Sequence, residues 1–112
     1  MTTNRAKRHT TTLPDGRKVD VLQLQSAVAA LPVENVPLER ISGVSNKPST
    51  GFSGLRYALC DPGIPGIADQ NMRLLDGRHR YLRRRDAGCA HMPIRIAPNE
   101  LIEASLIEGT QK

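Results

Sequence analysis

The stretch that decides the fold is LLDGRHRYLRRRDAGCAHMPIRI, residues 74–96 of a chain of 112. Leu74 and Leu75 end an apolar run, and Asp76-Gly77 marks a tight turn. The residues that follow, Arg78–Ala87, predict a helix, and Gly88 is placed to end it. Met92–Ile96 predicts another strand. The stretch therefore predicts a strand, a turn, a helix and a strand in succession.

The cationic start of this helix is its main chemical feature. Arg78, His79 and Arg80 occupy the first turn, where the backbone N–H groups already carry partial positive charge. Each such placement costs about 0.3–1 kcal/mol at an exposed site. Gly77 lets an anion approach the backbone, and a bound phosphate would turn this repulsion into attraction. We therefore expect Gly77, Arg78, His79 and Arg80 to bind phosphate, with Asp76 as the N-cap; the alternative is a solvated basic face that binds nothing.

A family resemblance rests on the same residues. Residues 76–80 (DGRHR), followed by residues 86–88 (DAG) and the strand Met92–Ile96, resemble the ParB/sulfiredoxin superfamily, and more specifically the ParB N-terminal nuclease-like domain. Val36–Ile41 resembles the opening strand of that domain, and the likeness covers Val33–Ile107. It implies a small α+β fold with a short mixed sheet and packed helices. It also implies that the glycine turn binds nucleotide phosphates, those of CTP or ATP.

The chain departs from the family pattern at informative positions. Arg78 stands where sulfiredoxin has a Cys, so the thiolate chemistry is missing. Partitioning ParB proteins have Glu-Arg-Arg after the glycine, where this chain has Arg-His-Arg, and they continue into a helix-turn-helix domain for which this chain leaves no room. We therefore expect a stand-alone and divergent version of the domain.

The overall charge favours a polyanionic partner. Sixteen Lys and Arg against eleven Asp and Glu leave a net charge of +5, and twelve of these cations are Arg, which suits bidentate contact with phosphate. The alternative is that the excess only aids solubility. Residues 1–12 are expected to form a flexible basic arm ahead of a single domain at 13–112. The residues expected to attract the DNA backbone are Arg5, Lys7, Arg8, Arg83 and Arg84.

The rest of the chain divides into short elements. Residues 14–16 (PDG) predict a turn between two strands. Asp20 is placed as the N-cap of a helix over Val21–Leu31, where apolar residues recur every three or four positions, although a strand over Val19–Leu24 competes. The other expected elements are strands at Thr10–Leu13, Arg17–Val21 and Val36–Ile41, a loop at Ser42–Ser53, a helix at Gly54–Cys60, a hairpin of Ile64–Ala68 with Met72–Leu75, and a last helix capped by Asn99 and ended by Gly109.

The sequence argues against a membrane protein, a secreted protein and a metal-binding protein. The chain has no apolar run that could span a bilayer and no apolar segment of a secretory signal, so we expect no membrane partner and a cytoplasmic location. Cys60 and Cys89 are too few for a disulfide framework or a zinc site. His9, His79 and His91 lack metal-site spacing, so no metal site is expected.

Three functions remain open. The first is a phosphate-binding module of a phage or mobile element that binds a nucleotide or a DNA backbone. The nucleotide would be CTP or ATP, with Mg²⁺ where a nucleotide is bound. In this function the bound nucleotide orders the loop at Ser42–Ser53, and the ordered loop changes a surface that contacts a partner. The second is a nuclease or phosphotransferase with His79 as acid–base catalyst and Glu39 as the most plausible distant carboxylate. The third is a protein-binding inhibitor that keeps the fold without catalysis.

Overall fold

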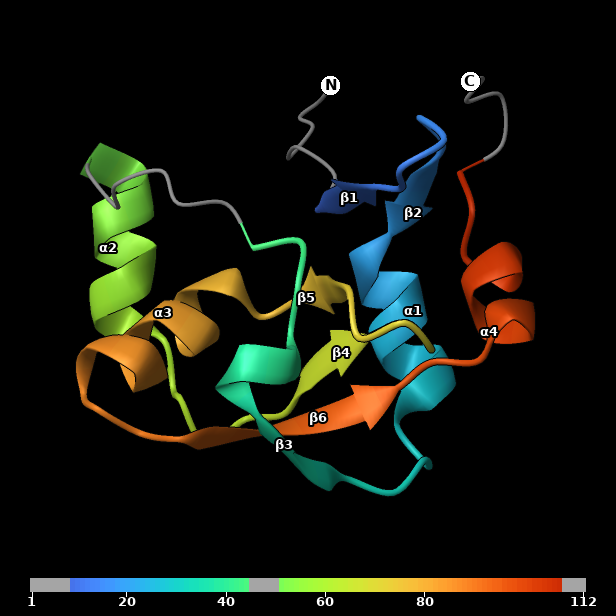
Figure 1. The fold of residues 1–112 in the computed structure, drawn as a ribbon. Helices are drawn as coiled ribbons and strands as arrows, with labels where there is room; N and C mark the ends of the chain where they lie inside the picture. The colour runs from blue at the N-terminus through green and yellow to red at the C-terminus, as the bar shows by residue number, and fades with distance from the viewer. Residues whose placement is uncertain (1–8, 45–50, 108–112) are drawn as a thin grey trace.

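A four-stranded sheet forms the centre of the structure, a computed structural model that describes residues 9–44 and 51–107 (Figure 1). Its strand order is β3-β6-β4-β5. The strand β6 (His91–Ile96) pairs antiparallel with β3 (Glu34–Pro37) and parallel with β4 (Gly66–Ala68). In turn, β4 pairs antiparallel with β5 (Leu74–Asp76). The sheet is therefore mixed, and together with the helices around it confirms the α+β class.

A two-stranded hairpin lies ahead of this sheet. β1 (Thr10–Thr12) and β2 (Lys18–Asp20) pair antiparallel around the turn at residues 14–16. The predicted hairpin is thus present. The flexible arm predicted over residues 1–12 is wrong at residues 10–12, because these residues pair with β2 in the folded domain. The residues before His9 lie outside the described part.

Asp20 begins the first helix, as predicted. α1 (Val21–Val28) follows it, and the Asp20 carboxylate accepts a hydrogen bond from the Gln23 amide at 3.1 Å. This bond satisfies a backbone donor that has no partner within the helix. The helix ends at Val28 instead of Leu31, and the competing strand over Val19–Leu24 is wrong beyond Asp20.

The sheet buries aliphatic side chains on both faces. Ile67 and Ala68 are neighbours in β4 yet belong to different clusters, and so do Leu74 and Leu75 of β5, because consecutive side chains of a strand point to opposite faces. The cluster on the first face consists of Val19, Leu24, Val28, Ile67, Leu75, Ala97 and Ile102. The cluster on the second face consists of Val36, Leu38, Ile41, Ala68, Leu74, Met92 and Ile94.

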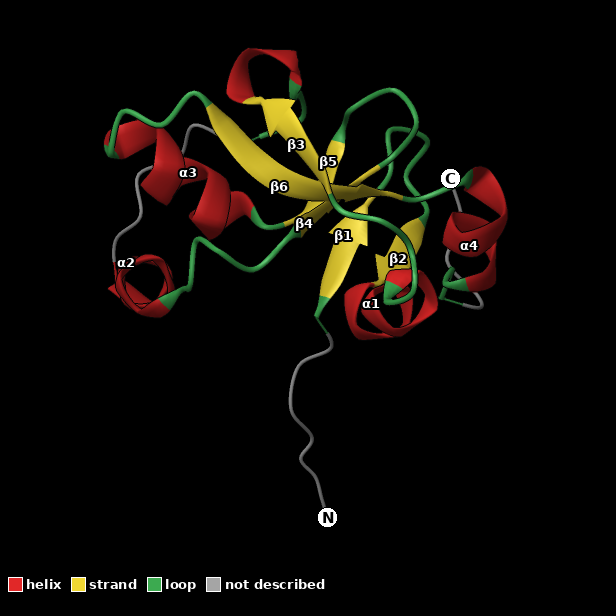
Figure 2. Cartoon of the chain, turned by 90° about the horizontal axis from the view of Figure 1, so that it is seen from below, coloured by secondary structure: helices red, strands yellow, loops and turns green. Residues whose placement is uncertain are grey.

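The helices gather in two groups. α2 (Gly51–Leu59) and α3 (Arg78–Asp86) contact each other at one end of the sheet, whereas α1 and α4 (Asn99–Ala104) contact each other at the other end (Figure 1, Figure 2). Gly88 has a φ of +80° and follows the end of α3, as predicted. The predicted succession of strand, turn, helix and strand is therefore confirmed. None of the described helices is long and apolar enough to cross a membrane.

Two predicted boundaries are wrong in the middle of the chain. The strand expected over Val36–Ile41 ends at Pro37, and the chain continues as a 3₁₀ helix, η1 (Leu38–Arg40), closed by a hydrogen bond from the Ile41 amide to the Leu38 carbonyl at 3.1 Å. The loop expected over Ser42–Ser53 is shorter, since α2 begins at Gly51. Residues 45–50 of that loop lie outside the described residues, so the predicted ordering of this loop remains a prediction.

The start of the last helix also differs. Asn99 is the first residue of α4, and Pro98 occupies the cap position without any side-chain hydrogen bond. The helix ends at Ala104, so Gly109 does not end it. The buried Ser105 hydroxyl donates to the Leu101 carbonyl at 3.0 Å, which satisfies it at this early end.

Candidate functional site

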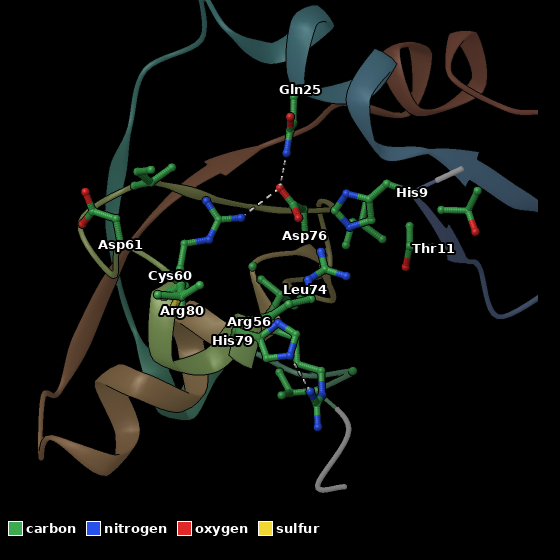
Figure 3. A pocket seen from close by; sticks show the side chains of 18 of the residues that line it. His9, Thr11, Gln25, Arg56, Cys60, Asp61, Leu74, Asp76, His79 and Arg80 are labelled. Carbon is green, nitrogen blue, oxygen red and sulfur yellow. Dashed lines mark hydrogen bonds and ion pairs between the residues drawn. The ribbon is translucent and has the colours of Figure 1, made fainter. Parts of the chain in front are cut away.

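A cavity of about 900 Å³ opens between the two groups of helices (Figure 3). Its floor is the end of β5 and the first turn of α3, residues 74–80. One wall comes from α2 and the loop that follows it, and the opposite wall comes from His9, β1 and Gln25 of α1. The cavity therefore contains the four residues predicted to bind phosphate, Gly77, Arg78, His79 and Arg80.

The first turn of α3 points the positive end of a helix at this cavity. Gly77 occupies the N-cap position just before the helix, and no side chain caps the helix. The first helical hydrogen bond runs from the Tyr81 amide to the Gly77 carbonyl at 2.8 Å. The prediction that Asp76 caps the helix is wrong, because its carboxylate is engaged by other side chains. The partial positive charge of this end is therefore not offset by a capping carboxylate.

Gly77 is required by the fold itself. Its φ is +109°, a conformation that side chains disfavour, and a Cβ atom there would lie 3.1 Å from the Cα of Gly66 in β4. A Cβ on Gly66 would in turn lie 2.9 Å from the Asp76 carbonyl oxygen. The turn and β4 thus meet backbone to backbone. Sequence analysis assigned this glycine to the approach of an anion, whereas the structure shows contact with a neighbouring strand.

Arg80 is held by protein groups rather than directed at open space. Its guanidinium donates to an Asp76 carboxylate oxygen at 3.0 Å and to the Pro65 carbonyl at 3.1 Å. The Asp76 side chain is 6% exposed and that of Arg80 is 14% exposed. The Gln25 amide donates to the same carboxylate oxygen at 2.9 Å. This network joins the turn to α1 and to the residue before β4, so Arg80 has a positioning role.

Arg78, His79 and Arg56 form the cationic group of the cavity. An Arg78 guanidinium nitrogen lies 3.2 Å from Nε2 of His79. Because a guanidinium can only donate, this contact is a hydrogen bond when Nε2 accepts, which requires a neutral imidazole with its proton on Nδ1. Burial lowers the pKa of His79 below the ordinary 6.5, and the charges of Arg78, Arg56 and Arg80 lower it further. A neutral imidazole at this place can take up a proton.

The wall formed by α2 and the loop that follows it carries an apolar surface beside Arg56. Leu55 and Leu59 are one helical turn apart and are 52% and 74% exposed, and Ile64 in the following loop is 50% exposed. All three line the cavity. Large aliphatic side chains are usually withdrawn from water. The cavity therefore offers an apolar surface beside a cationic floor, which suits a ligand with both kinds of group.

The arginines predicted to attract DNA have other contacts. Arg83 donates to the carbonyls of Tyr57 and Ala58 at 3.1 Å each, at the C-terminal end of α2. Arg84 donates to the carbonyls of Pro62 and His91 at 2.9 and 3.1 Å. Neither lines the cavity. Both guanidinium groups thus tie α3 to neighbouring segments, and contact with DNA stays a prediction.

The remaining predicted positions fall outside the cavity or outside the described residues. Arg5, Lys7 and Arg8 belong to the part of the chain that the structure does not describe. Glu39 is exposed in η1 and does not line the cavity. It is therefore not the distant carboxylate that was expected.

Sequence analysis missed residues that only the fold brings to the site. Arg56, His9 and Gln25 come from three separate elements and line the same cavity. No local pattern in the sequence connects them. One signal was present, because Asp76 and Arg80 are four residues apart, the spacing at which opposite charges pair along a helix.

Comparison of the chain with protein-family models, with curated proteins and with solved structures finds no match. Among residues 9–44 and 51–107, no group of three or more His, Cys, Asp or Glu side chains is placed to hold a metal ion.

Proposed function

We propose that the cavity binds the phosphate groups of a nucleotide and that the chain is a divergent domain of the ParB/sulfiredoxin type. The observation that carries the proposal is the convergence of Arg56, Arg78 and His79 on one cavity, at the uncapped start of a helix. Burial lowers the pKa of His79 most, and the charges of Arg78, Arg56 and Arg80 lower it further, because positive groups this close repel one another. A bound oxyanion reverses the sign of that interaction.

Each cavity residue has a distinct role in the proposal. Arg78 and Arg56 donate charge-assisted hydrogen bonds to phosphate oxygens. His79 takes up a proton when the anion arrives. Arg80 contributes by fixing the turn through Asp76 and Pro65. The remainder of the nucleotide lies against the apolar wall of Leu55, Leu59 and Ile64.

The geometry favours a free nucleotide over a DNA backbone. The cationic group lies inside a cavity with walls on two sides, and a volume of about 900 Å³ is within the range of small-molecule sites. Contact with duplex DNA calls instead for cations spread along a surface. Arg83 and Arg84 are bound to main-chain carbonyls. The resemblance to the ParB/sulfiredoxin family supports CTP or ATP as the nucleotide.

The described residues do not offer a ligand set for Mg²⁺. The carboxylates that line the cavity are Asp61 and Asp76. Asp61 accepts the amide of Gly63 at 2.9 Å, and Asp76 is paired with Arg80. These two do not fit a protein-held metal centre. In the proposal, Mg²⁺ accompanies the nucleotide as the counter-ion of its phosphates.

Replacing Arg78 with alanine is expected to weaken CTP or ATP binding by about tenfold to a hundredfold, because a hydrogen bond to a charged group contributes about 1.5–3 kcal/mol. Isothermal titration calorimetry with CTP, with ATP and with a short DNA duplex measures the effect. Arg40→Ala is the matched control: it removes the same charge from an exposed residue outside the cavity and should leave nucleotide affinity unchanged.

Three results would count against the proposal, and a fourth would extend it to catalysis. Absence of nucleotide binding by the native protein overturns it directly. Equal losses in Arg78→Ala and Arg40→Ala would show only a general charge effect. Binding of duplex DNA with a steep salt dependence, between about 50 and about 200 mM salt, would identify a DNA backbone as the ligand. Release of phosphate from the nucleotide, abolished by His79→Ala, would make the domain an enzyme.

The lowered pKa of His79 predicts that anion binding tightens as the pH falls. The free protein holds this pKa below 6.5, and a neighbouring anion raises it, so binding takes up a proton. Between the pKa of His79 in the anion-bound protein and its lower pKa in the free protein, each unit by which the pH falls should increase the affinity for the anion by at most about tenfold. Sulfate is the best probe, because it does not itself titrate in this range.

The control for this pH effect is His79→Gln, which retains a polar side chain but cannot titrate. In titrations from about pH 8 down to about pH 5.5, the affinity for sulfate should rise in the native protein, and most of this rise should be absent in His79→Gln. His9 also lines the cavity. A pH dependence that persists in His79→Gln and disappears in His9→Gln would assign the effect to the wrong histidine and contradict the prediction.

A further inference from the structure

The Asp76 carboxylate has two oxygens in different situations. Oδ2 accepts from both Gln25 and Arg80. Oδ1 accepts from no residue within the described part of the chain, although the side chain is 6% exposed and lines the cavity. A buried acceptor without a donor is costly, and such groups are few in folded proteins. This oxygen therefore needs an explanation.

The free oxygen faces the cavity wall opposite to the apolar one. Figure 3 shows the Oδ2 side of Asp76 joined to Gln25 and Arg80, and the other oxygen turned toward the ring of His9. His9 and Thr11 come from the hairpin side and line the cavity with Asp76. No hydrogen bond joins His9 to Asp76 in the described structure, although both line the cavity.

We propose that Asp76 Oδ1 and His9 form a subsite for a hydroxyl group of the ligand, and that the cavity therefore selects hydroxylated phosphate esters. The inference rests on the proposed function, because it concerns the same cavity. A ligand hydroxyl donates to Oδ1 and removes the cost of the unpaired acceptor. His9 stands where it can exchange a second hydrogen bond with the same hydroxyl, since an imidazole both donates and accepts.

The distances along the chain support a small ligand. Asp76 precedes Arg78 by two residues and His79 by three, so the Cα atoms of these three residues lie at most about 11 Å apart. A hydroxyl a few bonds from the phosphorus, as in glycerol 3-phosphate or a pentose 5-phosphate, spans such a gap. An ester without a hydroxyl leaves Oδ1 unpaired and should bind more weakly.

The three histidines provide the test on the unmodified protein. His79 lies at the phosphate group, His9 lies at the hydroxyl subsite, and His91 is exposed outside the cavity. Nuclear magnetic resonance of their ring nitrogens is followed during titration with inorganic phosphate, propyl phosphate and glycerol 3-phosphate. His79 should shift with all three compounds, His9 should shift further with glycerol 3-phosphate than with the other two, and His91 should not shift.

Affinities measured in parallel should favour glycerol 3-phosphate over propyl phosphate by about tenfold, the effect of one hydrogen bond to a charged acceptor. Asp76→Asn should reduce that preference to about threefold or less while inorganic phosphate still binds. If Asp76→Asn does not fold, the preference in the native protein and the His9 resonances decide the matter.

The outcomes separate the two proposals. Equal affinity for the two esters, or a preference that Asp76→Asn leaves intact, overturns the hydroxyl subsite and leaves the phosphate site standing. A preference that disappears when EDTA is added would assign Oδ1 to a divalent cation and also overturn the subsite. If neither His79 nor the affinity responds to inorganic phosphate or either ester, the proposed function fails, and the subsite fails with it.

Discussion

Gly66→Ala is expected to lower the free energy of unfolding by about 2–3 kcal/mol, the upper part of the range for overpacking a core. A Cβ at this position would lie 2.9 Å from the Asp76 carbonyl oxygen, 3.2 Å from a methyl carbon of Ile94 and 3.3 Å from the terminal carbon of Met92. The carbonyl belongs to the backbone of β5 and cannot move without shifting the turn. Urea unfolding followed by circular dichroism measures the change.

Gly63→Ala is the control for this effect. Its added Cβ would meet only a side-chain oxygen of Asp61, at 3.2 Å, and the residue is exposed. We expect a change within about 0.5 kcal/mol, as for an ordinary surface substitution. Equal stability of Gly66→Ala and Gly63→Ala would show that β4 and the glycine turn do not approach each other as closely as the structure has them.

Arg80→Ala is expected to cost about 3 kcal/mol of stability, because it leaves the buried Asp76 carboxylate without its cationic partner. The loss also removes the hydrogen bond to the Pro65 carbonyl. Arg78→Ala is expected to lower the free energy of unfolding much less, because Arg78 is only partly buried and lies at the open cavity. Unfolding curves of the two variants should therefore differ, with Arg80→Ala much the less stable.

The double variant Asp76→Asn with Arg80→Met tests whether Arg80 positions the turn or contacts phosphate. Removing both charges avoids an unpaired buried ion, so the double variant should recover more than half of the stability lost in Arg80→Ala. Its affinity for inorganic phosphate should stay within about threefold of the native value, since no group that contacts phosphate has been removed. A loss of tenfold or more in the folded double variant would mean that Arg80 binds the anion directly.

The candidate site was only partly predictable. The concentration of charge at residues 78–80 is local, so the sequence shows it directly. The roles within that group are not local. Arg80 turns back to Asp76, while Arg78 and His79 remain at the cavity, and this division depends on the packing of the turn against β4 and α1. From their charge alone, Arg78, His79 and Arg80 were all predicted to bind phosphate.

By itself the sequence determined the elements whose signals are short-range. The turn at residues 14–16, the Asp20 cap, the glycine turn before α3 and the end of α3 at Gly88 depend on backbone preferences and hydrogen bonds between near neighbours. These preferences act within a few residues, so they can be read in order along the chain.

Only the tertiary structure decided which residues share the cavity. His9, Gln25, Arg56 and His79 are far apart in sequence, and packing brings them to one cavity. Burial of Leu24 and Val28 in the core places α1 on one side of the glycine turn. On the other side, Arg83 of α3 holds α2 by donating to the carbonyls of Tyr57 and Ala58. Apolar burial has no direction of its own. Its outcome depends on how all the elements fit together, and no single segment of the sequence carries that information.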